Sequence, residues 1–264
     1  MDMIVCVKQI PDPETPPAAF KVDEAAKKAL PAQGISPVIS PFDAQAVEAA
    51  LRIRDAVGGG KITVISVGPA SARDAIKHGL AMGADEGVLI DDPALADADS
   101  FVTARALAAA IKKLGSFDII FCGRQAADWD MGVVGPGLAE LLGVPAVTIS
   151  KSVQAVNSHL RVERVLTDGF ETVDVQTPCV VTISNELGDP RYPQLRQIML
   201  AARKQVSVWS AADLGLGPEE LRSPMQIERL YVPVKESNVE IIEGDTVQDQ
   251  AQNLARRLRE SKLI

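Results

Sequence analysis

Short apolar runs rich in β-branched residues alternate with segments of helical periodicity over residues 1–150. Such an alternation predicts parallel strands joined by right-handed crossovers, which place helices on both faces of the sheet. The sequence therefore predicts an α/β fold with a doubly wound parallel sheet. The expected strands are Ile4–Val7, Ile62–Val67, Gly87–Ile90, Phe117–Cys122 and Ala146–Ile149, and the expected helices are Ala44–Val57 (with Asp43 as N-cap), Ala70–Met82, Ser100–Leu114 and Val134–Leu142.

The composition agrees with a sheet that is buried on both faces. Of 264 residues, 47% are hydrophobic and 4% are aromatic, so Ala, Val, Leu and Ile must build the core. The net charge of −8 argues against nucleic acid as a main partner, because binding its backbone requires clustered positive charge. No run reaches the ~18 apolar residues of a membrane span.

The cysteines argue for a reducing compartment. Cys6, Cys122 and Cys179 lie far apart in the sequence, so neither a zinc-type pairing nor a disulfide framework is predicted. Each lies in an apolar run, where we expect a small buried side chain. The N-terminus enters a strand-like run at once, without the features of a secretory signal. We therefore expect a cytoplasmic protein.

After residue 150 the pattern changes to shorter pieces that predict an antiparallel hairpin region at residues 150–185. Its expected strands are Ser152–Val156, His159–Val165, Glu171–Gln176 and Cys179–Ser184, with a turn at Asn157 and Ser158. We assign residues 1–213 to one α/β domain, which includes this region and a basic segment at residues 189–204.

Residues 214–264 are predicted to form an extended arm that ends in a helix. Asp245 or Thr246 caps this helix, and an apolar stripe follows at helical spacing. The stripe requires a surface to cover it, which either a partner chain or the remainder of this chain could supply. Its members are Val247, Ala251, Leu254 and Leu258.

A glycine-rich loop follows the strand at Phe117–Cys122 and leads into a helix. Glycines allow a ligand to approach the backbone, and a helix N-terminus favours phosphate. Asp128 and Asp130 oppose phosphate unless they face a ribose, cap the helix or bind a cation. An ordinary strand-to-helix loop explains the spacing equally well. Residues 40–43 and 68–70 are two further loops that could share the same edge of the sheet.

Catalytic machinery is sparse in this sequence. His78 and His159 are its two histidines, and no candidate nucleophile with an acid partner stands out. The motifs of P-loops and of standard dinucleotide-binding loops are missing. We therefore predict no catalytic residue and no metal site.

Residues 189–204 form a basic segment in a chain that is acidic overall. They carry four basic residues against one acid, while Leu195, Ile198, Met199 and Ala202 recur at helical spacing. A basic, partly apolar helix in an acidic protein is typical of a docking surface for an acidic partner. A surface helix packed on its own core is the alternative.

A set of motifs extends over nearly the whole chain, from the first strand and its turn to the basic segment. The motifs are Val5-Cys6-Val7-Lys8-Gln9-Ile10-Pro11-Asp12, Ser40-Pro41-Phe42-Asp43, Ala46-Val47-Glu48-Ala49-Ala50-Leu51-Arg52, Gly79-Leu80-Ala81-Met82-Gly83-Ala84-Asp85, Gly123-Arg124-Gln125-Ala126 through Gly135, Pro178-Cys179-Val180-Val181-Thr182, and Pro190-Arg191-Tyr192-Pro193 to Ile198-Met199. Together these motifs resemble the beta subunit of electron transfer flavoprotein.

This resemblance implies an electron carrier rather than an enzyme, with the adenine nucleotide alpha-hydrolase-like fold of that family. It implies a heterodimer with an alpha subunit that holds most of the redox FAD. The beta subunit would bind AMP, or a second FAD as in electron-bifurcating relatives. The partners would be flavoprotein dehydrogenases and a quinone oxidoreductase or another redox acceptor, and residues 214–264 would pack on the alpha subunit.

The resemblance also places the site residues. Leu195 would anchor the dehydrogenase, and the phosphate would lie by the helix that begins near Val133. The implied docking residues are Arg191, Tyr192, Leu195, Ile198 and Met199, and the implied nucleotide-binding residues are Cys6, Ser40, Pro41, Phe42, Asp43, Val67, Gly123, Arg124, Gln125, Ala126, Ala127, Asp128, Trp129, Asp130, Met131, Gly132, Val133 and Val134.

The chain departs from the family pattern within this set. Met131, Gly132 and Val133 replace polar side chains, so phosphate binding would rest on backbone amides. Ser40 replaces the usual Asn, and Trp129 fills a position that is normally small or acidic, where it could stack on a ring or block one.

Two other functions share this predicted fold. An adenylyl-transferring enzyme would need a pyrophosphate-binding loop after the first strand, and Lys8-Gln9-Ile10-Pro11 does not resemble one. A nucleotide-sensing stress protein would self-associate without a flavoprotein partner.

Overall fold

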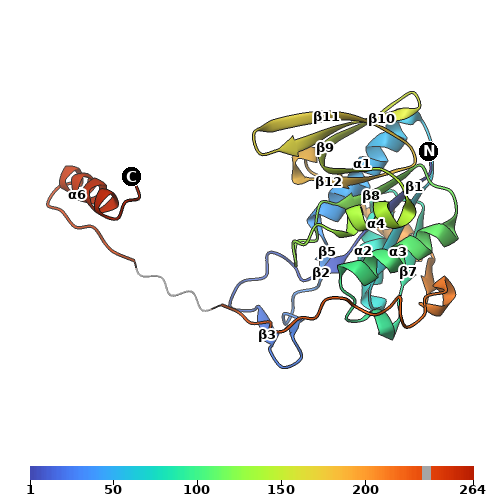
Figure 1. Cartoon of the computed structure of the whole chain (residues 1–264), viewed down its shortest axis with the longest axis horizontal. Coiled ribbons are helices and arrows are strands. Elements are labelled where there is room, and N and C mark those ends of the chain that lie inside the picture. Colours follow the sequence, from blue (N-terminus) through green and yellow to red (C-terminus); the bar gives the residue numbers. More distant parts are fainter. Residues whose placement is uncertain (234–238) are drawn as a thin grey trace. The chain divides into compact units, whose positions relative to one another are not determined.

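The computed structural model describes residues 1–233 and 239–264, and in these residues the chain forms two compact units (Figure 1). The larger unit runs from Met1 to Leu230, and the smaller from Tyr231 to Ile264.

Within the described residues of the larger unit, nine strands form one sheet in the order β11-β10-β9-β12-β8-β1-β6-β7-β13. The strands from β9 to β13 in this order are all parallel, and β10 and β11 add an antiparallel hairpin at one edge. The bounds are β1 Met3–Cys6, β6 Ile62–Val67, β7 Glu86–Ile90, β8 Ile119–Gly123, β9 Ala146–Val156, β10 His159–Leu166, β11 Gly169–Gln176, β12 Cys179–Ile183 and β13 Val206–Trp209.

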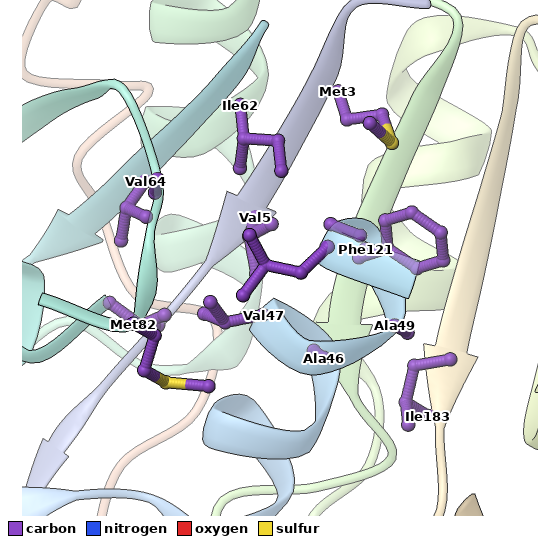
Figure 2. Close-up of a cluster of buried hydrophobic side chains, with 14 of the residues drawn as sticks. Met3, Val5, Ala46, Val47, Ala49, Ile62, Val64, Met82, Phe121 and Ile183 are labelled. Atoms are coloured by element: carbon purple, nitrogen blue, oxygen red, sulfur yellow. The ribbon is translucent and has the colours of Figure 1, made fainter. Parts of the chain in front are cut away.

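Helices cover both faces of the parallel part, as the alternation predicts. One face packs against α1 and α2, and Figure 2 shows Val5 and Phe121 of the sheet against Ala46 and Val47 of α1. The other face packs against α3 and α4. The bounds are α1 Pro41–Val57, α2 Arg73–Met82, α3 Ser100–Leu114 and α4 Val134–Leu142, and a further helix, α5 Leu195–Arg203, packs on α2.

The segment between β1 and α1 contains two short antiparallel strand pairs. Their bounds are β2 Gln9–Ile10 with β5 Val38–Ile39, and β3 Lys21–Asp23 with β4 Lys28–Leu30. Lys8 O accepts the N–H of Ser40 at 2.9 Å, so the end of this segment lies beside the end of β1.

Two expectations about the strands of this unit were wrong, and one strand was not expected. Cys179–Ser184 was expected to be antiparallel, yet β12 runs parallel to both β8 and β9, because its fully buried apolar side chains pack between helix layers. Ala146–Ile149 and Ser152–Val156 were expected to be separate strands, yet they form the single strand β9, with a bulge and a positive φ at Ile149. Strand β13 was not foreseen.

The third wrong expectation concerns Asp43 as an N-cap. Ser40 occupies that position, Pro41 begins α1, and Asp43 lies in the first turn with its carboxylate directed elsewhere. The predicted bounds of α3 and α4 and the turn at Asn157 and Ser158 are confirmed.

The smaller unit contains α6 Val247–Glu260. Thr246 caps it, and Thr246 and Asp249 exchange side-chain and backbone hydrogen bonds in a capping box. Upstream, in the larger unit, Leu214, Leu216 and Leu221 pack against the core beside α3, although the sequence assigned them to the arm. None of the helices in the described residues could span a membrane.

Candidate functional site

The ends of three neighbouring strands bring the predicted site together. Strands β8, β1 and β6 are adjacent and parallel, so Gly123, Cys6 and Val67 lie at the same edge of the sheet. Ligands of open α/β sheets bind beyond this carboxyl edge. Helix α1 and helix α4 both begin close to it, after residue 40 and residue 133.

The side chain of Asp43 connects three elements at this edge through hydrogen bonds. Its Oδ2 accepts the backbone N–H of Lys8 at 2.8 Å, and its Oδ1 accepts that of Gly123 at 3.1 Å. Burial raises the pKa of Asp43 to about 7, and the two N–H donors offset part of that increase. The side chain therefore fixes the start of α1 to the ends of β1 and β8.

Gly123 leaves space for that carboxylate. A Cβ at this position would lie 2.8 Å from Phe42 Cβ and would also overlap Asp43 Oδ1. Arg124, the next residue, places its guanidinium 5.6 Å from the centre of the Phe42 ring. These contacts bring residues 42–43 and 123–124, which are far apart in the sequence, into one cluster.

The charge of the loop after β8 is partly neutralised within the protein. Lys8 Nζ lies 2.6 Å from Asp128 Oδ2, and Gln125 Nε2 donates to Asp130 Oδ1 at 2.7 Å. An anion would therefore meet less negative charge here than the sequence suggests. Trp129, Met131 and Val133 are exposed.

Buried polar atoms without partners lie near this edge. In the described part of the chain, five buried side-chain atoms have no hydrogen-bond partner, and two of them, Ser40 Oγ and Ser66 Oγ, belong to residues beside the ends of β1 and β6. The first-turn N–H groups of α4, such as that of Val134, have no carbonyl within their helix. These donors and hydroxyls fit a nucleotide, whose ribose and phosphate can satisfy them. Ser66 was not predicted, since a serine within a buried strand gives no signal beyond its place before Val67.

The basic segment presents its apolar side chains outward. Tyr192 is 90% exposed and Leu195 74% exposed. Ile198 and Met199 on α5 are also exposed, whereas Ala201 packs inward. The segment is thus a surface element with an uncovered apolar face. Arg191 differs from its neighbours, because its guanidinium is held by carboxylates of α1.

Comparison with known proteins identifies the family of this chain. Residues 30–214 match the family described as "Electron transfer flavoprotein domain". The chain belongs to the electron transfer flavoprotein family. This match confirms the resemblance seen in the motifs.

Curated members of the family are similar over the full length of the chain. It is 41% identical to an electron transfer flavoprotein subunit beta of Thermoanaerobacterium thermosaccharolyticum, with 100% of both chains covered. It is 37% identical to the caffeyl-CoA reductase-Etf complex subunit CarD of Acetobacterium woodii, again with 100% of both covered. It is 34% identical to the acryloyl-CoA reductase electron transfer subunit gamma of Anaerotignum propionicum, with the same coverage.

The function of this chain is therefore electron transfer, as in the other members of its family. Its relatives are named as electron-transfer subunits, so the expected role as a carrier is confirmed and the adenylyl-transfer and stress-sensor alternatives are set aside. Membership of the family implies a flavin in the working complex.

Proposed function

We propose that this chain is the beta subunit of a heterodimeric electron transfer flavoprotein and that it binds AMP or a second FAD at the carboxyl edge of its sheet. The observation that carries the nucleotide proposal is the cluster around Asp43, where the ends of β1 and β8 meet α1 beside unpaired buried hydroxyls. The binding residues would be those that the family resemblance assigns, with Ser66 added.

Different residues would contact different parts of the nucleotide, according to their chemistry. The N-terminus of α4 offers free N–H groups and a partial positive charge to a phosphate. Lys8 lowers the cost of placing that phosphate near Asp128. The exposed ring of Trp129 can stack on a base or an isoalloxazine. This chain therefore binds and orients, while bound FAD supplies the electron-accepting chemistry of the complex.

The exposed segment at residues 189–204 would dock flavoprotein dehydrogenases, with Leu195 as the anchor. Carriers that exchange electrons with several partners use small interfaces, in which one apolar side chain can contribute much of the specificity. The acceptor would be a quinone oxidoreductase or another redox protein. The buried, free cysteines agree with a reducing, cytoplasmic location.

The helix α6 would pack on the alpha subunit. Val247 is 82% exposed and Leu254 47% exposed, so its stripe is uncovered in the smaller unit. An amphipathic helix gains most of its stability when another surface covers its apolar side.

Co-expression with an alpha subunit tests the proposal. We expect a yellow heterodimer, and mass analysis of the ligands released by denaturation should find FAD together with AMP, or two FAD per heterodimer. One FAD and no second nucleotide would contradict the nucleotide proposal. Failure to co-purify with any flavoprotein alpha chain would contradict the subunit assignment.

A further inference from the structure

The polar face of α1 holds the chain that leads into the docking segment, residues 189–204. Gln45 Nε2 donates to Asn185 O at 3.3 Å and to Gly188 O at 3.2 Å. Two turns further along, Arg52 Nη1 donates to Leu187 O at 3.0 Å. Both side chains lie on the same face of the helix, so α1 supports this stretch along its length.

The strongest contact on this face joins Glu48 to Arg191. Glu48 Oε2 accepts the Nε of Arg191 at 2.7 Å and its backbone N–H at 3.1 Å. Arg52 Nε donates to the other oxygen of Glu48 at 2.8 Å, and Asp55 Oδ2 lies 2.9 Å from Arg191 Nη2. The side chain of Glu48 is 6% exposed, so water competes weakly for this ion pair.

A second contact holds the other end of the segment. Lys77 on α2 donates to the carbonyl oxygens of Ala201 at 2.8 Å and Ala202 at 3.1 Å, and also to that of Lys204. Lys204 in turn donates its Nζ to Ala84 O at 2.7 Å. A cation at the last carbonyls of α5 also stabilises the C-terminus of that helix.

Between these two contacts lie the exposed side chains. Tyr192 follows Arg191 directly, and Leu195 and Met199 precede the carbonyls that Lys77 binds. Because Arg191 and Lys204 are engaged within the chain, they are poorly placed to serve as free charges for a partner. The basic residues that remain on α5 are Arg196 and Arg203, for which the described part of the chain shows no ion pair.

We propose that Glu48 is a positioning residue for docking: through Arg191 it fixes the start of the segment on α1, while Lys77 fixes its end, so that Leu195 is presented in one conformation. The inference rests on the docking role proposed above. A segment that is already ordered loses less conformational entropy when a partner binds. A small electron-transfer interface buries little area that could offset this entropy cost.

Amide hydrogen exchange of the full-length protein tests the first half of this inference. Glu48→Gln keeps the size of the side chain and removes its charge, and we expect amides of α5 to exchange about tenfold faster. Arg191→Gln should have the same effect, and the double variant should be no worse than the more severe single one, because both remove one interaction. Arg191→Lys should restore part of the protection.

Arg161→Gln is the matched control. Arg161 forms a bidentate pair with Asp174 on the hairpin of β10 and β11, at 2.9 and 3.0 Å, and both side chains of this pair are exposed. Its loss should leave exchange in α5 unchanged. If Glu48→Gln also leaves exchange in α5 unchanged, the positioning role is overturned.

Kinetics of the heterodimer test the second half, with a substrate-reduced flavoprotein dehydrogenase that passes electrons to the wild-type heterodimer as the electron donor. Glu48→Gln should raise the KM for this donor about tenfold and leave kcat at saturating donor unchanged. If Leu195→Ala leaves KM unchanged, the docking function itself fails, and the positioning role falls with it. If Leu195→Ala raises KM but Glu48→Gln does not, only the positioning role is overturned.

Discussion

Asp43 and Gly123, 80 positions apart in the sequence, are joined by a hydrogen bond of 3.1 Å that closes the start of α1 over the end of β8. The contact exists because position 123 has no side chain. Phe42 and Asp43 occupy the volume that a Cβ there would need. The carboxyl edge of the sheet thus depends on one glycine and one buried acid.

Gly123→Ala should therefore loosen the nucleotide site. The added methyl group meets the backbone of Phe42 at 2.9 Å, and backbone cannot move aside cheaply. We expect a loss of about 2 kcal/mol in unfolding free energy and a lower nucleotide content in the purified heterodimer. Gly59→Ala is the control, because a Cβ there meets nothing within 4 Å. Equal nucleotide content in both variants would contradict this view of the site.

Asp43 should also give the protein a characteristic pH dependence. Burial raises its pKa from 3.8 to about 7, so the folded state binds a proton that the unfolded state has released across this interval. The contribution of Asp43 to stability is therefore complete below pH 3.8 and is lost as the pH rises to about 7. We expect Asp43→Asn to remove this decline, which is roughly 1 kcal/mol per pH unit, in chemical unfolding at pH 5, 6 and 7.

Glu48 provides a control of opposite sign for that experiment. Burial alone would raise the pKa of Glu48, but the hydrogen bonds from Arg191 and Arg52 outweigh it and hold the pKa below its usual value. Its contribution is present at neutral pH and is lost as the pH falls through the folded pKa. Glu48→Gln should therefore lower stability at neutral pH more than in acid. If the loss of unfolding free energy changed with pH in the same direction in both variants, the assignment for Asp43 would be refuted.

Local patterns predicted most of the elements. Helix α3 begins where Asp99 accepts the N–H groups of Phe101 and Val102, a cap that sequence alone can signal. The direction of β12 could not be read in this way. The apolar run Cys179–Ile183 fits a strand that is buried on both faces, but the antiparallel pieces before it favoured an antiparallel partner. Only the pairing with β8 and β9 fixes its direction.

In the site, too, local sequence patterns predicted some features, whereas contacts between distant residues could not be predicted. An acid at the start of a helical pattern predicts an N-cap, but the N–H groups of Lys8 and Gly123 compete for the carboxylate of Asp43 and win. The pair formed by Glu48 and Arg191 joins positions 143 apart, which no local spacing could reveal. The loop that contains Gly123 and the exposed Leu195 did carry local signals, through their glycines and their helical spacing.

Leu195→Ala should slow electron exchange with dehydrogenases and leave assembly intact. Leu195 is 74% exposed and packs little against its own chain, so its loss should change the unfolding free energy by less than ~0.5 kcal/mol. We expect about tenfold lower kcat/KM in reduction assays at limiting dehydrogenase. Leu141→Ala, which removes another exposed leucine from α4, serves as the control. Similar rates for the two variants would show that Leu195 is not the anchor.

Two glycines of α4 offer a last test, on the phosphate site. A Cβ at Gly135 would lie 2.5 Å from Thr182 Cγ2, and Thr182 is held in place because its Oγ1 accepts the N–H of Ile149 at 2.9 Å. At Gly137 the nearest atom is the Cβ of Ala104, at 3.4 Å. Gly135→Ala should therefore displace the start of α4 and reduce nucleotide content, whereas Gly137→Ala should retain the nucleotide and gain up to ~1 kcal/mol from helix propensity. Phosphate analysis of both purified variants, alongside thermal unfolding, distinguishes a displaced helix N-terminus from general destabilisation; full nucleotide content in Gly135→Ala would place the phosphate elsewhere.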